Sequence, residues 1–376
     1  MELDLAALSR HPDVEAPNLH ASDAADRLLL DEAADALAGA APGTVAVIGD
    51  GYGALTLGAA ARHGIRGIRV HQDALTGERA LAANAARFGL GDAYAQHGLN
   101  AGLLEGAETV LLRLPRSLDA LDELAGAVAR HAPGTVRVFA GGMVKHMTPA
   151  MNDVLRRHLA RVDVTHARQK ARVLVASRPV PASPDGGTAW PRSRTDPATG
   201  LTVVAHGAAF AGPAVDVGTR LLVAHLGEAM PDTASAIDLG CGTGVLATAL
   251  ARARPGLRVL ACDQSAAAVA SARLTVAANG VADRVAVVRD DALSAQPDGV
   301  AELVVLNPPF HIGATVHTGI ALRLFADAGR VLVPGGELWT VWNSHLRYRP
   351  ALERLVGPTR QIARDRTFTV TASRKS

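Results

Sequence analysis

The chain has 376 residues, of which 48% are hydrophobic and 20% are charged, and its formal net charge is +2. This length exceeds a usual single core and predicts two domains of a well-buried globular protein. No apolar run reaches the ~18 residues that span a bilayer, and the N-terminus has no signal-peptide pattern. Because Cys241 and Cys262 both fall inside predicted core elements, we expect a cytoplasmic protein with reduced thiols and no membrane association.

The first half of the chain alternates apolar, strand-like runs with alanine-rich helical stretches. Its strand-like runs lie in VAVIGDGYGALTLGAA (residues 45–60), GIRVHQDAL (67–75) and ETVLLRLPRS (108–117). Such alternation implies a parallel sheet that is covered by helices on both faces, so we expect an α/β domain.

A segment rich in Pro, Ser, Gly and Thr follows, SRPVPASPDGGTAWPRSRTDPATG (residues 177–200). It has no apolar periodicity, which is typical of a linker. We therefore predict a first domain over residues 1–180, a linker over 181–200 and a second domain over 201–376.

The second domain opens with AFAGPAVDVGTRLL (residues 209–222), which places polar and small residues before an apolar helix. Phe210, Asp216 and Gly218 in this stretch are candidates for a flap over a bound cofactor. Asp216 is explained almost as well as the cap of the helix that follows it.

A glycine turn follows the next strand-like run, in AIDLGCGTG (residues 236–244). Gly240, Gly242 and Gly244 let the backbone approach a ligand with no Cβ in the way. A dinucleotide site would need Gly or Ala where Val245 stands, so the turn suits a ligand without phosphates. Asp238, at the end of the strand, is placed to help hold an ammonium group of that ligand.

Two further acids are expected at the same edge of the sheet. Asp263 ends the next strand, where a carboxylate accepts both ribose hydroxyls of a nucleoside, although capping of the following helix is an alternative role. Asp291 and Ala292 follow AVVRD (residues 286–290), where they could read an adenine amine; Asp290 is an equally plausible neighbour.

The most informative motif is Asn307-Pro308-Pro309-Phe310, which directly follows the apolar run LVVL. The Asn307 side-chain carbonyl and the Pro308 backbone carbonyl could both accept hydrogen bonds from a substrate amine and aim its lone pair. The prolines fix φ and donate no N–H, so the turn is rigid. Phe310 offers a face on which a base can stack. With the glycine turn, the motif predicts methylation of an amine on a planar substrate by S-adenosylmethionine.

The two halves share one pattern and differ where chemistry would be done. Gly49, Gly51 and Gly53 match the glycines of the second half, which indicates a duplicated domain. Val47 stands in place of Asp238, and Gln72 (or Asp73) in place of Asp263. The residues from Arg113 to Arg116 replace the Asn-Pro-Pro-Phe turn. We therefore expect the first copy to be catalytically dead and to contribute RNA affinity, with Arg113 and Arg116 as candidate phosphate contacts.

Positive charge clusters in two stretches. Eight Arg or Lys residues lie between His345 and Ser376 against two acids, and six lie between Arg168 and Arg194 against one. Arginine suits bidentate phosphate contacts, and this clustering favours an RNA partner. A GC-rich genome would explain the preference for arginine over lysine equally well. The histidines have no ligand-type spacing, so no metal is expected.

The C-terminal half resembles class I methyltransferases of the small methyltransferase group. The whole chain is similar to the bacterial ribosomal RNA guanine-N2 methyltransferases of the RlmG/RsmC type, through AFAGPAVDVGTRLL, DLGCGTGVLA, NPPFH and GGELWTVWNSHLRYRPALERLVG. The resemblance implies two tandem Rossmann-like methyltransferase domains, the first of them degenerate. It also implies methyl transfer to the N2 amine of a guanine in ribosomal RNA or a ribosomal subunit, by a chain that we expect to be monomeric. NSHLRY favours the large-subunit RlmG type.

Other functions remain open at this point. Protein-glutamine N5 methyltransferases acting on release factors share the turn, but they resemble a single catalytic domain with a tyrosine in the last position. DNA adenine methyltransferases share it too, yet no separate recognition domain is visible. A non-catalytic RNA-binding assembly factor would not need the acids and the Asn307 turn.

Overall fold

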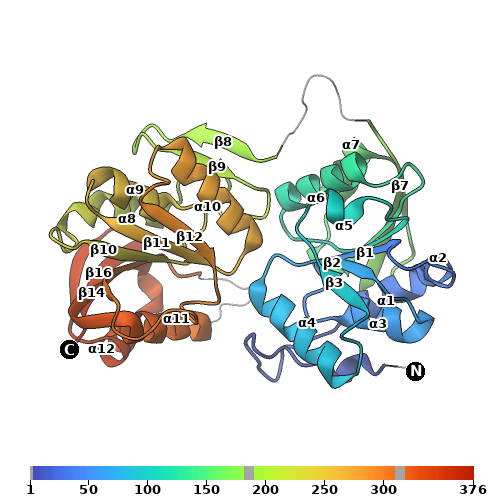
Figure 1. The fold of residues 1–376 in the computed structure, drawn as a ribbon, viewed down its shortest axis with the longest axis horizontal. Coiled ribbons are helices and arrows are strands. Elements are labelled where there is room, and N and C mark those ends of the chain that lie inside the picture. The colour runs from blue at the N-terminus through green and yellow to red at the C-terminus, as the bar shows by residue number, and fades with distance from the viewer. Residues whose placement is uncertain (1–2, 182–189, 310–317) are drawn as a thin grey trace. The chain divides into compact units, whose positions relative to one another are not determined.

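The computed structural model describes residues 3–181, 190–309 and 318–376, and these divide into two compact units, Met1–Trp190 and Pro191–Ser376. Figure 1 shows that each unit is a central sheet between helices. Phe310 lies outside the described residues. Of the described helices, none is long and apolar enough to cross a membrane.

The first unit holds one mixed sheet of seven strands among its described residues. Its strands are β1 Val45–Ile48, β2 Ile68–His71, β3 Tyr94–Gln96, β4 Thr109–Arg113, β5 Arg137–Met143, β6 Leu159–Val164 and β7 Ala171–Pro179. Its helices are η1 Leu5–Ala7, α1 Ala24–Glu32, α2 Ala34–Leu37, α3 Ala54–His63, α4 Leu75–Arg87, α5 Ala101–Leu104, α6 Leu118–His131, η2 Val144–His146 and α7 Pro149–His158.

The described part of the second unit forms a seven-stranded sheet and a short hairpin. Its strands are β8 Arg192–Thr195, β9 Thr202–Ala205, β10 Ser235–Leu239, β11 Arg258–Asp263, β12 Val285–Arg289, β13 Ala301–Leu306, β14 Leu332–Asn343, β15 Thr359–Arg364 and β16 Phe368–Arg374. Its helices are α8 Val217–His225, η3 Leu226–Glu228, α9 Val245–Ala253, α10 Ala266–Ala278, α11 Thr318–Val331, η4 Ser344–Leu346 and α12 Arg349–Leu355.

The two sheets have the same strand order. The first runs β3-β2-β1-β4-β5-β7-β6 and the second β12-β11-β10-β13-β14-β16-β15. In both, the neighbours among the first five strands are parallel and the last two strands join antiparallel. The predicted fold class, two tandem methyltransferase-like α/β domains, is confirmed.

Both faces of each sheet are covered, as the apolar strand sequences require. In β1, Val45 and Val47 pack into the core formed with α1, α3 and α4, while Ala46 and Ile48 pack into the core formed with α5, α6 and α7. Successive side chains of a strand point to opposite faces, so a strand that is buried on both must be apolar throughout. In the second unit α8, α9 and α10 cover one face through a core that includes Trp339.

The domain boundary differs from the expected linker. Residues 192–195, which composition placed between the domains, form β8 and pair with β9 inside the second unit. Asp196 stabilises the turn of this hairpin. Its carboxylate accepts hydrogen bonds from the amide and the hydroxyl of Thr199 and forms an ion pair with Arg220 of α8. Proline and serine content indicated irregular backbone, but pairing with β9 and anchoring to α8 order this stretch.

Strand register establishes which residues of the two halves are equivalent. Val47 lies between Val70 and Leu111 in the first sheet, as Asp238 lies between Ala261 and Val305 in the second. Counting along the neighbouring strands from these pairs matches Gln72 with Asp263, and Arg113 with Asn307. The alternative match of Asp263 with Asp73 is excluded.

Candidate active site

The glycine turn lies where the strand order reverses, after the central strand β10. Ligands of open α/β sheets bind outside the carboxyl ends of the strands at this point. The backbone φ angles are +67° at Gly240, +52° at Gly242 and +78° at Gly244. Residues that carry a side chain rarely adopt these values. A Cβ on Gly244 would also lie 3.0 Å from the Cβ of Ala272 on α10, which is tighter than ordinary contacts.

Asp238 is fully buried at the end of β10 beneath this turn. Its Oδ2 accepts a hydrogen bond of 2.9 Å from the Ala247 amide in the first turn of α9. Its Oδ1 is buried and has no hydrogen-bond partner among the described residues. Burial, reinforced by the nearby charge of Asp263, raises the pKa of Asp238 to about 7. A cationic group at Oδ1 would satisfy the orphaned acceptor and favour the ionised form.

Asp263 ends β11 and contacts both the glycine turn and the start of α10. Its Oδ2 accepts from the Gly242 amide at 3.0 Å, and its Oδ1 accepts from the Ser265 amide at 2.9 Å, just before α10. The alternative role as a helix cap is not borne out, because the N-cap of α10 is Ser265, whose hydroxyl accepts from the Ala268 amide at 3.1 Å. These contacts hold the carboxylate at the strand end, where a ligand of the sheet would bind.

Asp291 and Ala292 lie after β12 as expected, but the Asp291 carboxylate already has a strong partner. Arg323 of α11 donates to both of its oxygens, with 3.1 Å between Nη1 and Oδ2. Ala292 has a φ of +56°, and its carbonyl accepts a bond from the Cys262 thiol. Asp290 caps its own turn through the amides of Asp291 and Ala295. Arg323 was not anticipated, because nothing in the sequence connects α11 with this turn.

Asn307 directly follows β13, beside the glycine turn. Its side-chain amide donates to Asp216 Oδ2 at 3.1 Å and to Thr219 Oγ1 at 2.9 Å. Its Oδ1 is buried without a partner among the described residues. Pro308 is buried and Pro309 is exposed. The site therefore presents an amide whose donors are taken and whose acceptor is open.

The residues expected in a flap divide into two groups. Asp216 caps α8 by accepting from the Thr219 amide at 3.1 Å, as its alternative role required, and it also contacts Asn307. Gly218 is buried beside it. The Phe210 side chain is 71% exposed, so its ring does not pack into the protein. Thr219 was missed; its position three residues after the cap was the available signal, since it places the hydroxyl at the same helix end.

Two family descriptions match the chain: an RLMG N-terminal domain over residues 2–180 and a methyltransferase small domain over 200–372. Relatives named ribosomal RNA large subunit methyltransferase G are 36% identical in Streptomyces coelicolor, over 96% of both chains, and 37% identical in Pseudomonas entomophila, over 98% of this chain and 97% of the relative. The chain belongs to the ribosomal RNA large subunit methyltransferase G family. The resemblance found from sequence is confirmed.

The solved structures agree with this methyltransferase family in fold. The 16S rRNA N2 guanine methyltransferase RsmC of T. thermophilus, in complex with AdoMet and guanosine, aligns with a TM-score of 0.73 at 23% identity. The alignment covers 96% of this chain and 97% of that one. At this identity the likeness shows the shared two-domain fold.

S-adenosylmethionine is the cofactor of this methyltransferase family, and the residues of the second half suit it. The three glycines leave room for a close approach, the open Oδ1 of Asp238 matches an ammonium group, and Asp263 places a carboxylate at the strand end against the Gly242 amide. No phosphate-binding pattern is needed. No group of three His, Cys, Asp or Glu residues that could hold a metal occurs in the described part of the chain.

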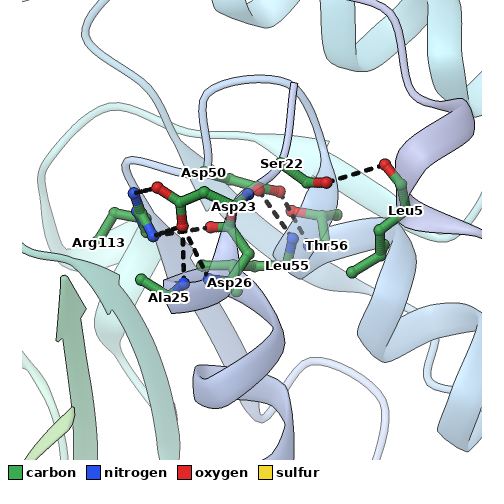
Figure 2. A network of polar contacts seen from close by, with 9 residues as sticks. All are labelled: Leu5, Ser22, Asp23, Ala25, Asp26, Asp50, Leu55, Thr56 and Arg113. Atoms are coloured by element: carbon green, nitrogen blue, oxygen red, sulfur yellow. Dashed lines mark hydrogen bonds and ion pairs between the residues drawn. The ribbon is translucent and has the colours of Figure 1, made fainter. Parts of the chain in front are cut away.

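In the first half of this methyltransferase the polar side chains at the end of β4 and in the glycine turn bind to other residues of the same half (Figure 2). Arg113 forms ion pairs with Asp23 at 2.9 Å and with Asp26 at 3.2 Å. Asp50 lies in the glycine turn and accepts from the amides of Leu55 and Thr56. Burial raises the pKa of Asp26 to about 7 and also raises that of Asp50.

This network corrects one expectation about RNA contacts. The strand-end position of Arg113 made it a candidate phosphate ligand together with Arg116. Arg113 is instead an internal ion-pair partner, because the N-terminal end of α1 brings two carboxylates to it. Arg116 is exposed and contacts His146, so it stays a candidate.

Proposed function

We propose that the chain transfers a methyl group from S-adenosylmethionine to the exocyclic N2 amine of a guanine in ribosomal RNA, with the large subunit preferred. The observation that carries this proposal is the open, buried Oδ1 of Asn307 beside the glycine turn. The names of the relatives at 36% and 37% identity support ribosomal RNA as the substrate.

The chain's own residues supply positioning. The Asn307 Oδ1 and the Pro308 carbonyl accept the two hydrogens of the amine and direct its lone pair, which is otherwise delocalised into the ring. Phe310 offers a stacking face worth about 1–3 kcal/mol. When bound, the cofactor supplies an electrophilic methyl on a sulfonium. Because the amine acidifies as it is alkylated, its proton can leave to water, and holding two reactants together can contribute roughly 7–11 kcal/mol.

We assign the cofactor contacts to Asp238, Gly240, Gly242, Gly244 and Asp263, with support from their geometry. Asp291 and Ala292 stay candidates for the adenine end, although the Asp291 carboxylate would have to share its oxygens with Arg323. We further propose that the first domain aids RNA recognition, and that the protein acts in the cytoplasm as a monomer.

The test is transfer from labelled S-adenosylmethionine to naked large- and small-subunit rRNA, assembled subunits, release factor and DNA. The expected result is label in large-subunit rRNA that nucleoside mass spectrometry identifies as N2-methylguanosine. Label in a release-factor glutamine, or no label in any substrate despite RNA binding, would replace the proposal by one of the alternatives. Light scattering of the full chain tests the monomer.

A further inference from the structure

We propose that Asp216 and Thr219 are positioning residues, which set the amide orientation of Asn307 so that its carbonyl oxygen faces the substrate amine. This inference rests on the proposed function of Asn307. It assigns to Asp216 a task in the transfer step in place of the cofactor contact that the sequence suggested.

The first step of the argument is the chemistry of the contact. An ionised carboxylate can only accept hydrogen bonds, so the group of Asn307 that faces Asp216 Oδ2 at 3.1 Å must be the NH₂. The second amide hydrogen goes to Thr219 Oγ1 at 2.9 Å. Turning the amide by 180° would put Oδ1 against a carboxylate oxygen. The carboxylate therefore selects one of two orientations that have almost the same shape.

The second step is where this orientation leaves the oxygen. Asn307 Oδ1 is buried and unpartnered among the described residues. An unsatisfied buried acceptor is destabilising, and most such groups in proteins find a partner. An N–H of the substrate amine would donate to this oxygen and satisfy it. We call the contacts of Asp216 and Thr219 with this amide the clamp. Without the clamp the amide could rotate and present its NH₂ group, which would repel the hydrogens of the substrate amine.

The surroundings of Asp216 preserve this arrangement. A Cβ on Gly218 would lie 3.2 Å from Asp216 Oδ2 and 3.1 Å from the ring of Phe368, tighter than ordinary contacts. A side chain at this position would push against the carboxylate that holds Asn307. Gly218 thus serves the clamp by keeping space for it.

The first half of the chain provides an internal comparison. Asp23 caps α1 as Asp216 caps α8, Asp26 follows three residues later as Thr219 does, and Arg113 occupies the strand end in place of Asn307. The contact between helix cap and strand end is therefore a property of the duplicated fold. Only in the second half does it hold a group with an acceptor that can be aimed.

The experiment measures transfer to an unmodified large-subunit rRNA transcript by the full chain carrying Asp216→Asn, Thr219→Val or Thr219→Ser. We expect Asp216→Asn to lower kcat at least about tenfold, because its amide can donate to Asn307 Oδ1 and stabilise the wrong orientation. Thr219→Val should lower kcat less, and Thr219→Ser should restore it. Cofactor Kd should stay within about twofold for all three.

Asp23→Asn is the matched control, since it removes the same capping charge in the half without chemistry and should leave kcat unchanged. A kcat for both Asp216→Asn and Thr219→Val within about twofold of wild type would overturn the clamp, provided that Asn307→Ala is inactive in the same assay. Activity in Asn307→Ala would instead overturn the proposed function itself. If Asp216→Asn does not fold, the Thr219→Val and Thr219→Ser pair, which keeps the cap, decides.

Discussion

The two halves of the chain share strand order, register and glycine turns. They differ in the partners of the polar groups at the switch point, the place at the carboxyl ends of the strands where the strand order reverses. In the second half Asp238 and Asn307 each keep one buried acceptor without a partner among the described residues. In the first half Asp23, Asp26 and Arg113 bind one another (Figure 2). A buried acceptor without a partner costs stability, so the open oxygens of Asp238 and Asn307, both beside the glycine turn, point to the second half as the one that binds reactants.

The helix cap beneath the glycine turn makes the same comparison more sharply. In the second half the strand-end Asp238 accepts from Ala247, the third residue of α9. In the first half the strand-end residue is Val47, and Asp50 of the turn itself accepts from Thr56, the third residue of α3. Both halves therefore keep a hydrogen bond from the third residue of the helix to a carboxylate, but the carboxylate lies on the strand in the second half and in the turn in the first. The first copy thus retained what the fold needs and lost the acid assigned to the cofactor.

The largest effect should come from Asn307→Ala, which removes the open acceptor of the active half. We expect transfer to large-subunit rRNA to fall below about a tenth of wild type while cofactor affinity changes little. Single-turnover transfer and calorimetry measure the two quantities. Retention of more than that activity would show that Asn307 does not hold the amine.

A second prediction concerns the number of cofactor sites. Calorimetry of the full chain should give one site for S-adenosylmethionine, because Gln72 and Val47 replace both acids in the first half. Asp263→Ala combined with Gly242→Arg should abolish binding. Two sites in the wild type, or binding that survives the double substitution, would contradict the assignment of the first copy as dead.

Removing the first half should separate recognition from chemistry. A fragment of residues 191–376 keeps the β8–β9 hairpin, and we expect it to bind the cofactor normally but to lose RNA affinity. Phosphate contacts give a log–log salt slope of about −0.7 per neutralised phosphate on single strands, so the fragment's slope should be shallower. A fragment that methylates rRNA as well as the full chain would show that the first copy only buttresses the second.

A smaller effect should follow pH. Burial raises the pKa of Asp238 to about 7, so the carboxyl is largely protonated below this pH. A cationic ammonium group prefers the ionised form, hence cofactor affinity should rise with pH through about 7 and then level off. Calorimetry at about pH 6 and pH 8 measures the change. In Asp238→Asn affinity should be lower and this part of the pH dependence absent.

The smallest effect on activity should come from Arg113→Met in the first half, which we expect to leave kcat unchanged but to cost about 3 kcal/mol or less of stability. Burial raises the pKa of Asp26 to about 7, so the folded state holds an extra proton between about pH 4 and 7 and stability falls as pH rises through this window. Loss of Arg113 should extend the fall to higher pH. Urea unfolding at several pH values tests this, and an unchanged pH profile would contradict it.

The sequence by itself determined the duplicated α/β architecture, because apolar runs and glycine turns recur in both halves at matching intervals. It also determined the methyltransferase motifs and the family, since Asn307, Asp238 and Asp263 each lie within a few residues of a strand end. Local patterns of this kind depend on neighbours in sequence and can be read without coordinates.

Only the tertiary structure decided which partners these side chains have. Asn307 meets Asp216 across 91 positions of sequence, Arg113 meets Asp23 across 90, and Arg323 meets Asp291 across 32. Such contacts arise where strand ends and helix starts converge at the switch point of the sheet. No periodicity records them, because they depend on the packing of distant elements and not on local spacing.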